Sequence, residues 1–192
     1  MISHTISDSN DMFLKRSNFY QSVNTLMANF GTLQSSIISQ LFDSYCTSFY
    51  GSQMWNLTCS SINIIYTAWN KAIRRIWRLP IRCHTNLLPF INNSHHIKDG
   101  LLIRFAKLYH AMETSNNKLA SFFARLGTLT ANSEIGRNVH FIFEEYGIWI
   151  HKSDLTTIKT AVNTKYEDVS SEECYIESIP PLLEMYCSSI VP

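Results

Sequence analysis

Apolar residues recur at helical spacing along most of the chain. Between Asn10 and Phe30 they return every three or four positions, and Gly31 follows as a helix stop. A second helix is predicted to begin at Ser35 or Ser36, which can cap its first turn, and to end near Gly51. Its expected apolar face consists of Ile37, Ile38, Leu41, Phe42 and Tyr45.

A third helix is predicted from about Ser61 to Leu79, because Pro80 disfavours helical geometry at the residue before it. Residues 83–93 form a short apolar stretch of one or two turns. Further helices are expected over residues 97–113, 118–126, 135–146 and 156–162. No segment alternates as a strand would, so the pattern predicts an all-α fold, an irregular bundle of about five to seven helices.

The periodicity weakens toward the end of the chain. We place a helical domain at residues 1–150 and a weakly ordered acidic tail at residues 151–192, with poor order expected from Tyr166 onward. No run of about 18 apolar residues occurs, and the first residues lack the regions of a signal peptide. Five scattered cysteines without a CxxC pair are typical of reduced thiols. We therefore expect a nuclear or cytoplasmic protein without membrane contact.

Charge is distributed unevenly along the sequence. From Ile64 to Lys152, twelve basic residues stand against five acids, a surplus of seven positive charges. From Ser153 onward, two basic residues stand against seven acids, a surplus of five negative charges. The basic middle suits a polyanionic partner, and the acidic end would repel that partner or fold back on the middle.

The third predicted helix separates an apolar from a basic face. Ile62, Ile65, Trp69, Ala72, Ile76 and Leu79 fall in one arc of roughly 100°. The nearly opposite arc holds Lys71, Arg74, Arg75 and Arg78, with Trp77 at the border. No acid lies between Ser44 and Asp99. The stripe predicts contact with a nucleic-acid backbone, with Trp77 as a stacking surface; an ordinary solvated helix face is the alternative.

Candidate chemistry elsewhere is weak. Two-metal phosphoryl transfer needs carboxylates held together at a structured turn, and none of the adjacent acid pairs stands in an apolar strand–turn context. Zinc binding by Cys83, His84, His95 and His96 is an alternative, but their spacing fits no common zinc module. We expect no catalytic residue, no cofactor and no metal site.

Short motifs follow one another in a fixed order: Ser44-Tyr45, Tyr50-Gly51, Trp55, then Trp69-x-Lys71-x-x-Arg74-Arg75 and Leu79-Pro80. Farther on come Thr85-Asn86-Leu87-Leu88 and Ser133-Glu134-Ile135-Gly136-Arg137-Asn138. This series resembles the region after the polymerase palm in reverse transcriptases of non-LTR (LINE-like) retrotransposons. The resemblance covers about residues 2–146.

The resemblance implies a thumb domain, a helical bundle that closes over the template–primer and grips its backbone. Lys71, Arg74, Arg75 and Arg78 become candidate contacts to RNA or an RNA–DNA duplex, and the missing palm and fingers of the parent polymerase become a partner. The family's paired aspartates are absent. We therefore expect a non-catalytic fragment of an RNA-directed DNA polymerase. The alternative is a helical protein-interaction module without nucleic-acid binding.

Overall fold

The computed structural model describes residues 8–130, 132–150 and 155–171. These residues form eight α-helices and three 3-10 turns and contain no strand, which confirms the all-α fold and exceeds the five to seven helices predicted. The α-helices are α1 (Asp8–Phe30), α2 (Ser35–Tyr45), α3 (Asn63–Ile76), α4 (Leu88–Asn92), α5 (Ile97–Glu113), α6 (Lys118–Leu129), α7 (Glu134–Tyr146) and α8 (Leu155–Ser171). The 3-10 turns are η1 (Ser52–Met54), η2 (Ser60–Ile62) and η3 (Thr85–Leu87).

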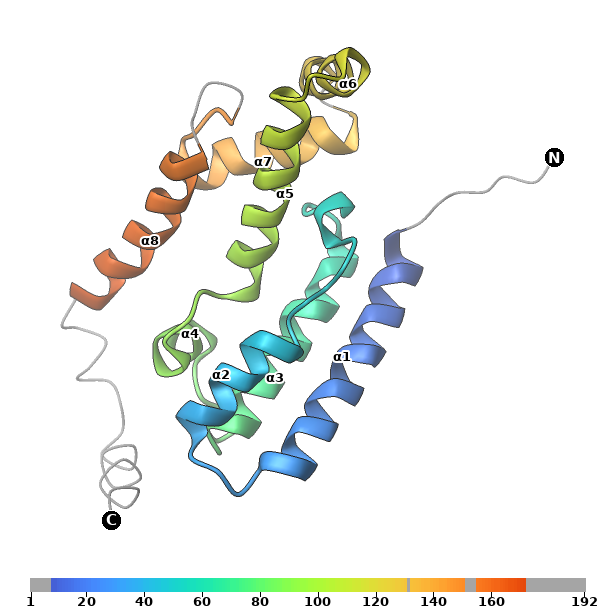
Figure 1. Ribbon diagram of the computed structural model, residues 1–192. Helices are drawn as coiled ribbons and strands as arrows, with labels where there is room; N and C mark the ends of the chain where they lie inside the picture. Colours follow the sequence, from blue (N-terminus) through green and yellow to red (C-terminus); the bar gives the residue numbers. More distant parts are fainter. Residues whose placement is uncertain (1–7, 131, 151–154, 172–192) are drawn as a thin grey trace.

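Helices α1, α2 and α3 pack together, and α5 joins them to α6, α7 and α8 (Figure 1). A single buried core runs from α1 to α8. Helices α1 and α3 run in the same direction. The hydroxyls of Ser9 and Ser61 lie 2.8 Å apart near their first turns, and Nη2 of Arg78 lies 3.5 Å from the Gly31 carbonyl oxygen beyond their last turns.

Helix α2 departs from its predicted cap and apolar face. Its N-cap is Gln34, whose side chain makes no capping bond, and the Ser35 hydroxyl instead donates to the Ile76 carbonyl of α3 (3.0 Å). Ile37 and Tyr45, both expected on the apolar face, are exposed. Ser39 is buried in their place, because its hydroxyl donates to Oδ1 of Asn92 (2.6 Å) and so loses no hydrogen bond.

Helix α3 ends three residues earlier than predicted. Arg78 adopts a left-handed conformation with φ of 51°. The Leu79 N–H bonds to the Arg74 carbonyl (2.8 Å), and the Arg78 N–H bonds to the Arg75 carbonyl (3.3 Å). This pair of bonds is a Schellman motif, which satisfies the last helical carbonyls and stops the helix before Pro80 exerts its effect.

Helices α5, α6 and α7 follow the prediction more closely, whereas α8 does not. Helix α5 has the predicted bounds, α6 extends three residues further than expected, and α7 begins one residue earlier. Helix α8 is longer than the predicted 156–162 and continues past Tyr166, with Ile158 and Val162 buried in the core. Residues 172–192 lie outside the described residues. In the part of the chain that the structure describes, no helix is long and apolar enough to cross a membrane.

Candidate nucleic-acid interface

The apolar face of α3 is buried as the pattern predicts. Ile65, Trp69, Ala72 and Ile76 are each at most 2% exposed. Leu79 lies beyond the helix and is only half-buried. Because this face is anchored in the core, the orientation of the opposite face toward solvent is fixed.

Three of the four predicted cations reach the surface. Lys71, Arg75 and Arg78 are exposed. The Arg75 guanidinium donates to Oδ1 of Asn24 on α1 (2.5 Å), and the Arg78 guanidinium contacts the carbonyl of Gly31, just after α1. We call these three cations the α1–α3 basic surface, because partners on or next to α1 hold two of them.

Arg74 and Trp77 are half-buried and hold the connection that follows α3. Nη2 of Arg74 donates to the Cys83 carbonyl (2.8 Å), and its Nε is buried without a hydrogen-bond partner. The indole N–H of Trp77 donates to Oδ1 of Asn92 (2.9 Å). Burial raises the pKa of the Cys83 thiol, and the nearby Arg74 charge opposes that rise. The exposed row therefore contains three cations rather than four.

Arg104 is another cation whose side chain is hydrogen-bonded within the protein. Its guanidinium donates to the carbonyls of Thr47 (2.5 Å) and Phe49 (3.3 Å), which fixes the loop between α2 and η1. Burial lowers the pKa of Arg104. Part of the sequence-level surplus of positive charge is therefore unavailable to a partner.

The shortage of acidic residues extends beyond α3 to most of the first half of the chain. Between Met12 and Lys98 the sole acid is Asp43, and eight basic residues stand against it, a surplus of seven. These basic residues are Lys15, Arg16, Lys71, Arg74, Arg75, Arg78, Arg82 and Lys98. The prediction from α3 did not include Asn24 on α1 or Gly31 just after it, which hold Arg75 and Arg78. Extending the window back past Asp43 would have been the signal, because it adds Lys15 and Arg16 and only that one acid.

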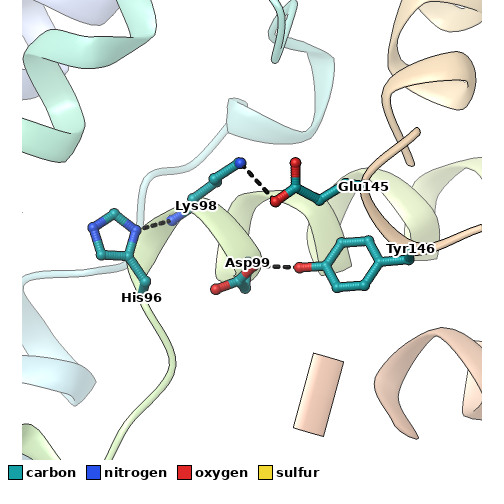
Figure 2. Close-up of polar contacts among 5 residues, drawn as sticks. All are labelled: His96, Lys98, Asp99, Glu145 and Tyr146. Atoms are coloured by element: carbon teal, nitrogen blue, oxygen red, sulfur yellow. Dashed lines mark hydrogen bonds and ion pairs between the residues drawn. The ribbon is translucent and has the colours of Figure 1, made fainter. Parts of the chain in front are cut away.

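A cluster of polar contacts fixes the start of α5 against the end of α7 (Figure 2). The Lys98 backbone N–H donates to Nδ1 of His96 (3.1 Å), so His96 caps α5. Nζ of Lys98 lies 3.0 Å from the Glu145 carboxylate. The Tyr146 hydroxyl donates to Asp99, whose side chain is buried. Nε2 of His96 also lies 3.3 Å from Oδ1 of Asn70, which links the cluster to α3.

The four candidate zinc ligands do not form a site in the structure. Within residues 8–130, 132–150 and 155–171, no three His, Cys, Asp or Glu side chains gather so that they could hold a metal ion. His96 is half-buried and caps a helix, whereas His84 and His95 are exposed. The polar cluster is therefore best understood as a structural connection between α3, α5 and α7.

Comparison of the chain with protein-family models, with curated proteins and with solved structures finds no match. The resemblance to retrotransposon reverse transcriptases thus depends on the sequence motifs alone. The geometry of the α1–α3 basic surface is a separate observation and is independent of that resemblance.

Proposed function

We propose that the chain binds the sugar–phosphate backbone of an RNA–DNA duplex, as a thumb-like, non-catalytic part of a reverse transcriptase. The observation that carries the proposal is the α1–α3 basic surface: three exposed cations in a region where Asp43 is the sole acid over more than eighty residues. Cations that neutralise phosphates release condensed counterions, and this release supplies most of the sequence-independent affinity.

The spacing of the cations supports contact with the backbone rather than with base edges. Lys71 and Arg75 lie one turn apart on α3, which is a rise of about 6 Å. Arg75 is held by Asn24 on α1, and an arginine has further N–H donors for a phosphate oxygen. Side chains that are already positioned lose less conformational entropy on binding. Phosphate contacts position a protein on a duplex without reading its sequence.

A salt series tests this function. The affinity of the full chain for an RNA–DNA hybrid is measured over a range of salt concentrations, together with Lys71→Ala, Arg75→Ala and Lys159→Ala. Each of the first two substitutions should reduce the slope of log affinity against log salt by roughly 0.9, for any hybrid sequence. Lys159 is an exposed cation on α8, on the side of the molecule away from α1, and its loss should leave the slope unchanged (Figure 1).

Circular dichroism of the same variants checks that the fold is retained, since exposed substitutions usually change stability by less than about 0.5 kcal/mol. If folded Lys71→Ala and Arg75→Ala variants bind with the slope of the parent, the duplex-binding function is wrong. The chain would then be better described as a helical protein-interaction module.

A further inference from the structure

Helix α6 buries its small residues and exposes its large ones. Ala124 and Gly127 are buried. The exposed residues, which we call the α6 apolar face, are Leu119, Phe122, Phe123, Leu126 and Leu129, between 41% and 82% exposed. A surface helix normally turns its large apolar residues toward the core. The described residues therefore leave at least 41% of each of these large apolar residues uncovered.

Close contacts with α7 hold α6 in this orientation. A Cβ placed on Gly127 would lie 2.8 Å from the side chain of Ile135, so α7 approaches where α6 has no side chain. Turning α6 to bury its phenylalanines would bring a large side chain into that contact. The side chain of Asn117 caps the first turn, and the Ser133 hydroxyl donates to the Gly127 carbonyl (2.7 Å). The second of these bonds ties the C-terminal part of α6 to the residue that precedes α7.

The α6 apolar face has the spacing of a coiled-coil seam. Leu119, Phe122, Leu126 and Leu129 follow one another at intervals of three, four and three residues, as positions a and d do. Lys118 and Arg125 are the charged residues of α6; both are exposed, and they stand seven residues apart on the same flank of that seam. The face thus fits a second helix with an apolar seam of its own and carboxylates along one flank.

We propose that α6 docks an acidic amphipathic helix of another protein, with partner carboxylates paired to Lys118 and Arg125. A second copy of this chain fits less well. Paired antiparallel, two α6 helices would set these cations against each other, and paired parallel they would leave them without opposite charges. Helix α6 lies at the end of the molecule opposite the turn between α1 and α2 (Figure 1). Arg78 lies at that turn, because its guanidinium contacts the Gly31 carbonyl.

Two designed peptides of about three heptads test the proposal. Both carry Leu at positions a and d; one has Glu at the flanking positions and the other has Lys. Their binding to the full chain is measured by fluorescence anisotropy at low salt. The Glu peptide should bind at least about tenfold more tightly than the Lys peptide, and Arg125→Glu should remove that preference. Phe122→Ser should weaken binding of the Glu peptide at least about fivefold.

Tyr50→Ser is the matched control, because Tyr50 is an exposed aromatic residue in the loop before η1, outside α6. It should leave binding of the Glu peptide unchanged. Failure of the full chain to bind the Glu peptide, or equal binding of the two peptides, overturns the proposal. Self-association in sedimentation experiments that Phe122→Ser abolishes also overturns it, since the occupant would then be a second copy.

Discussion

Arg78 occupies a backbone conformation that helix ends usually give to glycine. Its φ of 51° puts it at the position after the C-cap of α3, where a side chain is sterically disfavoured. The guanidinium reaches the Gly31 carbonyl at the end of α1, so the strained residue also connects two parallel helices. This position therefore combines a cost in backbone energy with an exposed positive charge.

Substituting Arg78 separates these two effects. Arg78→Gly relieves the left-handed strain, whereas Arg78→Ala retains it. The free energy of unfolding of the glycine variant should therefore be at least as high as that of the alanine variant, by up to about 1 kcal/mol. Both variants remove the same charge and should lose the same amount of duplex affinity. Urea unfolding and hybrid binding measure the two quantities. A glycine variant less stable than the alanine variant would show that backbone strain at this position is unimportant.

Loss of the hydroxyl should change the stability of the fold in opposite directions at two tyrosines, Tyr66 and Tyr146. The Tyr66 hydroxyl is buried without a hydrogen-bond partner, so Tyr66→Phe should be neutral or stabilise the fold by up to about 1 kcal/mol. The Tyr146 hydroxyl donates to the buried Asp99 carboxylate, so Tyr146→Phe should cost about 1–3 kcal/mol. Thermal or urea unfolding of the two variants distinguishes them, and equal effects would contradict the assignment of these hydrogen bonds.

Ionisation of Tyr66 should also contribute to the loss of stability at alkaline pH. Burial, followed by the charges of Asp99 and Cys59, raises the pKa of its phenol above the ordinary value of 10.0. A raised folded-state pKa contributes stability that is complete below pH 10 and is lost as the pH rises above it, because the unfolded chain ionises first. Tyr66→Phe should therefore flatten the fall in unfolding free energy above pH 10. An identical alkaline slope in parent and variant would contradict this expectation.

At the scale of the element, a helix could be placed well where its end signals are local. Helix α5 has its predicted bounds because an apolar repeat begins at Ile97 and Asn116-Asn117 interrupts it. Helix α2 begins at Ser35 as predicted but ends at Tyr45, well before the predicted end near Gly51. Its predicted face was also partly wrong, because Ser39 is buried through a bond to Asn92, 53 positions away. A polar residue can be buried at a position where the pattern predicts an apolar one, provided that a distant residue supplies its hydrogen-bond partner.

Two helical glycines give an element-scale prediction with a built-in control. A Cβ on Gly100 of α5 meets nothing within 4 Å, so Gly100→Ala should stabilise the fold by about 0.5–1 kcal/mol through helix propensity. A Cβ on Gly127 of α6 would lie 2.8 Å from Ile135, so Gly127→Ala should cost about 1–3 kcal/mol. Urea unfolding of both variants measures the difference. If both alanines stabilise the protein equally, α6 and α7 are not in close contact.

At the scale of the whole molecule, two exposed surfaces of different chemistry lie toward opposite ends. Arg78, at one end of the α1–α3 basic surface, lies at the turn between α1 and α2, and α6 lies at the other end of the molecule (Figure 1). Opposite placement allows a polyanion and a protein helix to be bound without competition. Substitutions on either surface should therefore act independently, since distant sites are usually additive.

The purified chain is expected to show no Mg²⁺-dependent primer extension on an RNA template. Two-metal phosphoryl transfer needs clustered carboxylates, and the adjacent pair Glu144-Glu145 is engaged elsewhere, with Glu144 next to His140 (3.1 Å) and Glu145 next to Lys98 (3.0 Å). The assay is nucleotide incorporation into a labelled primer. Incorporation that disappears when Glu144 and Glu145 are both changed to Gln would show that this pair is catalytic.

Much about this protein was determined by the sequence alone. Hydrophobic spacing is a local property, so it predicted an all-α fold, the buried face of α3 and the bounds of α5. It also located the stretch of positive charge, because a surplus of Lys and Arg over Asp and Glu needs no structure to be counted.

Only the tertiary structure decided which of these groups remain available to a partner. Arg74 donates to the Cys83 carbonyl and Arg104 to the loop after α2, and both side chains are half-buried. Arg75 also has a partner, Asn24 on α1, but its side chain remains exposed to solvent. The pattern could place Leu119 and Phe122 on a helix, but the close approach of α7 to Gly127 turned them outward. The physical reason is the same in each case. A hydrogen-bond acceptor or a packing surface supplied by another segment decides whether a side chain is buried or left for a ligand.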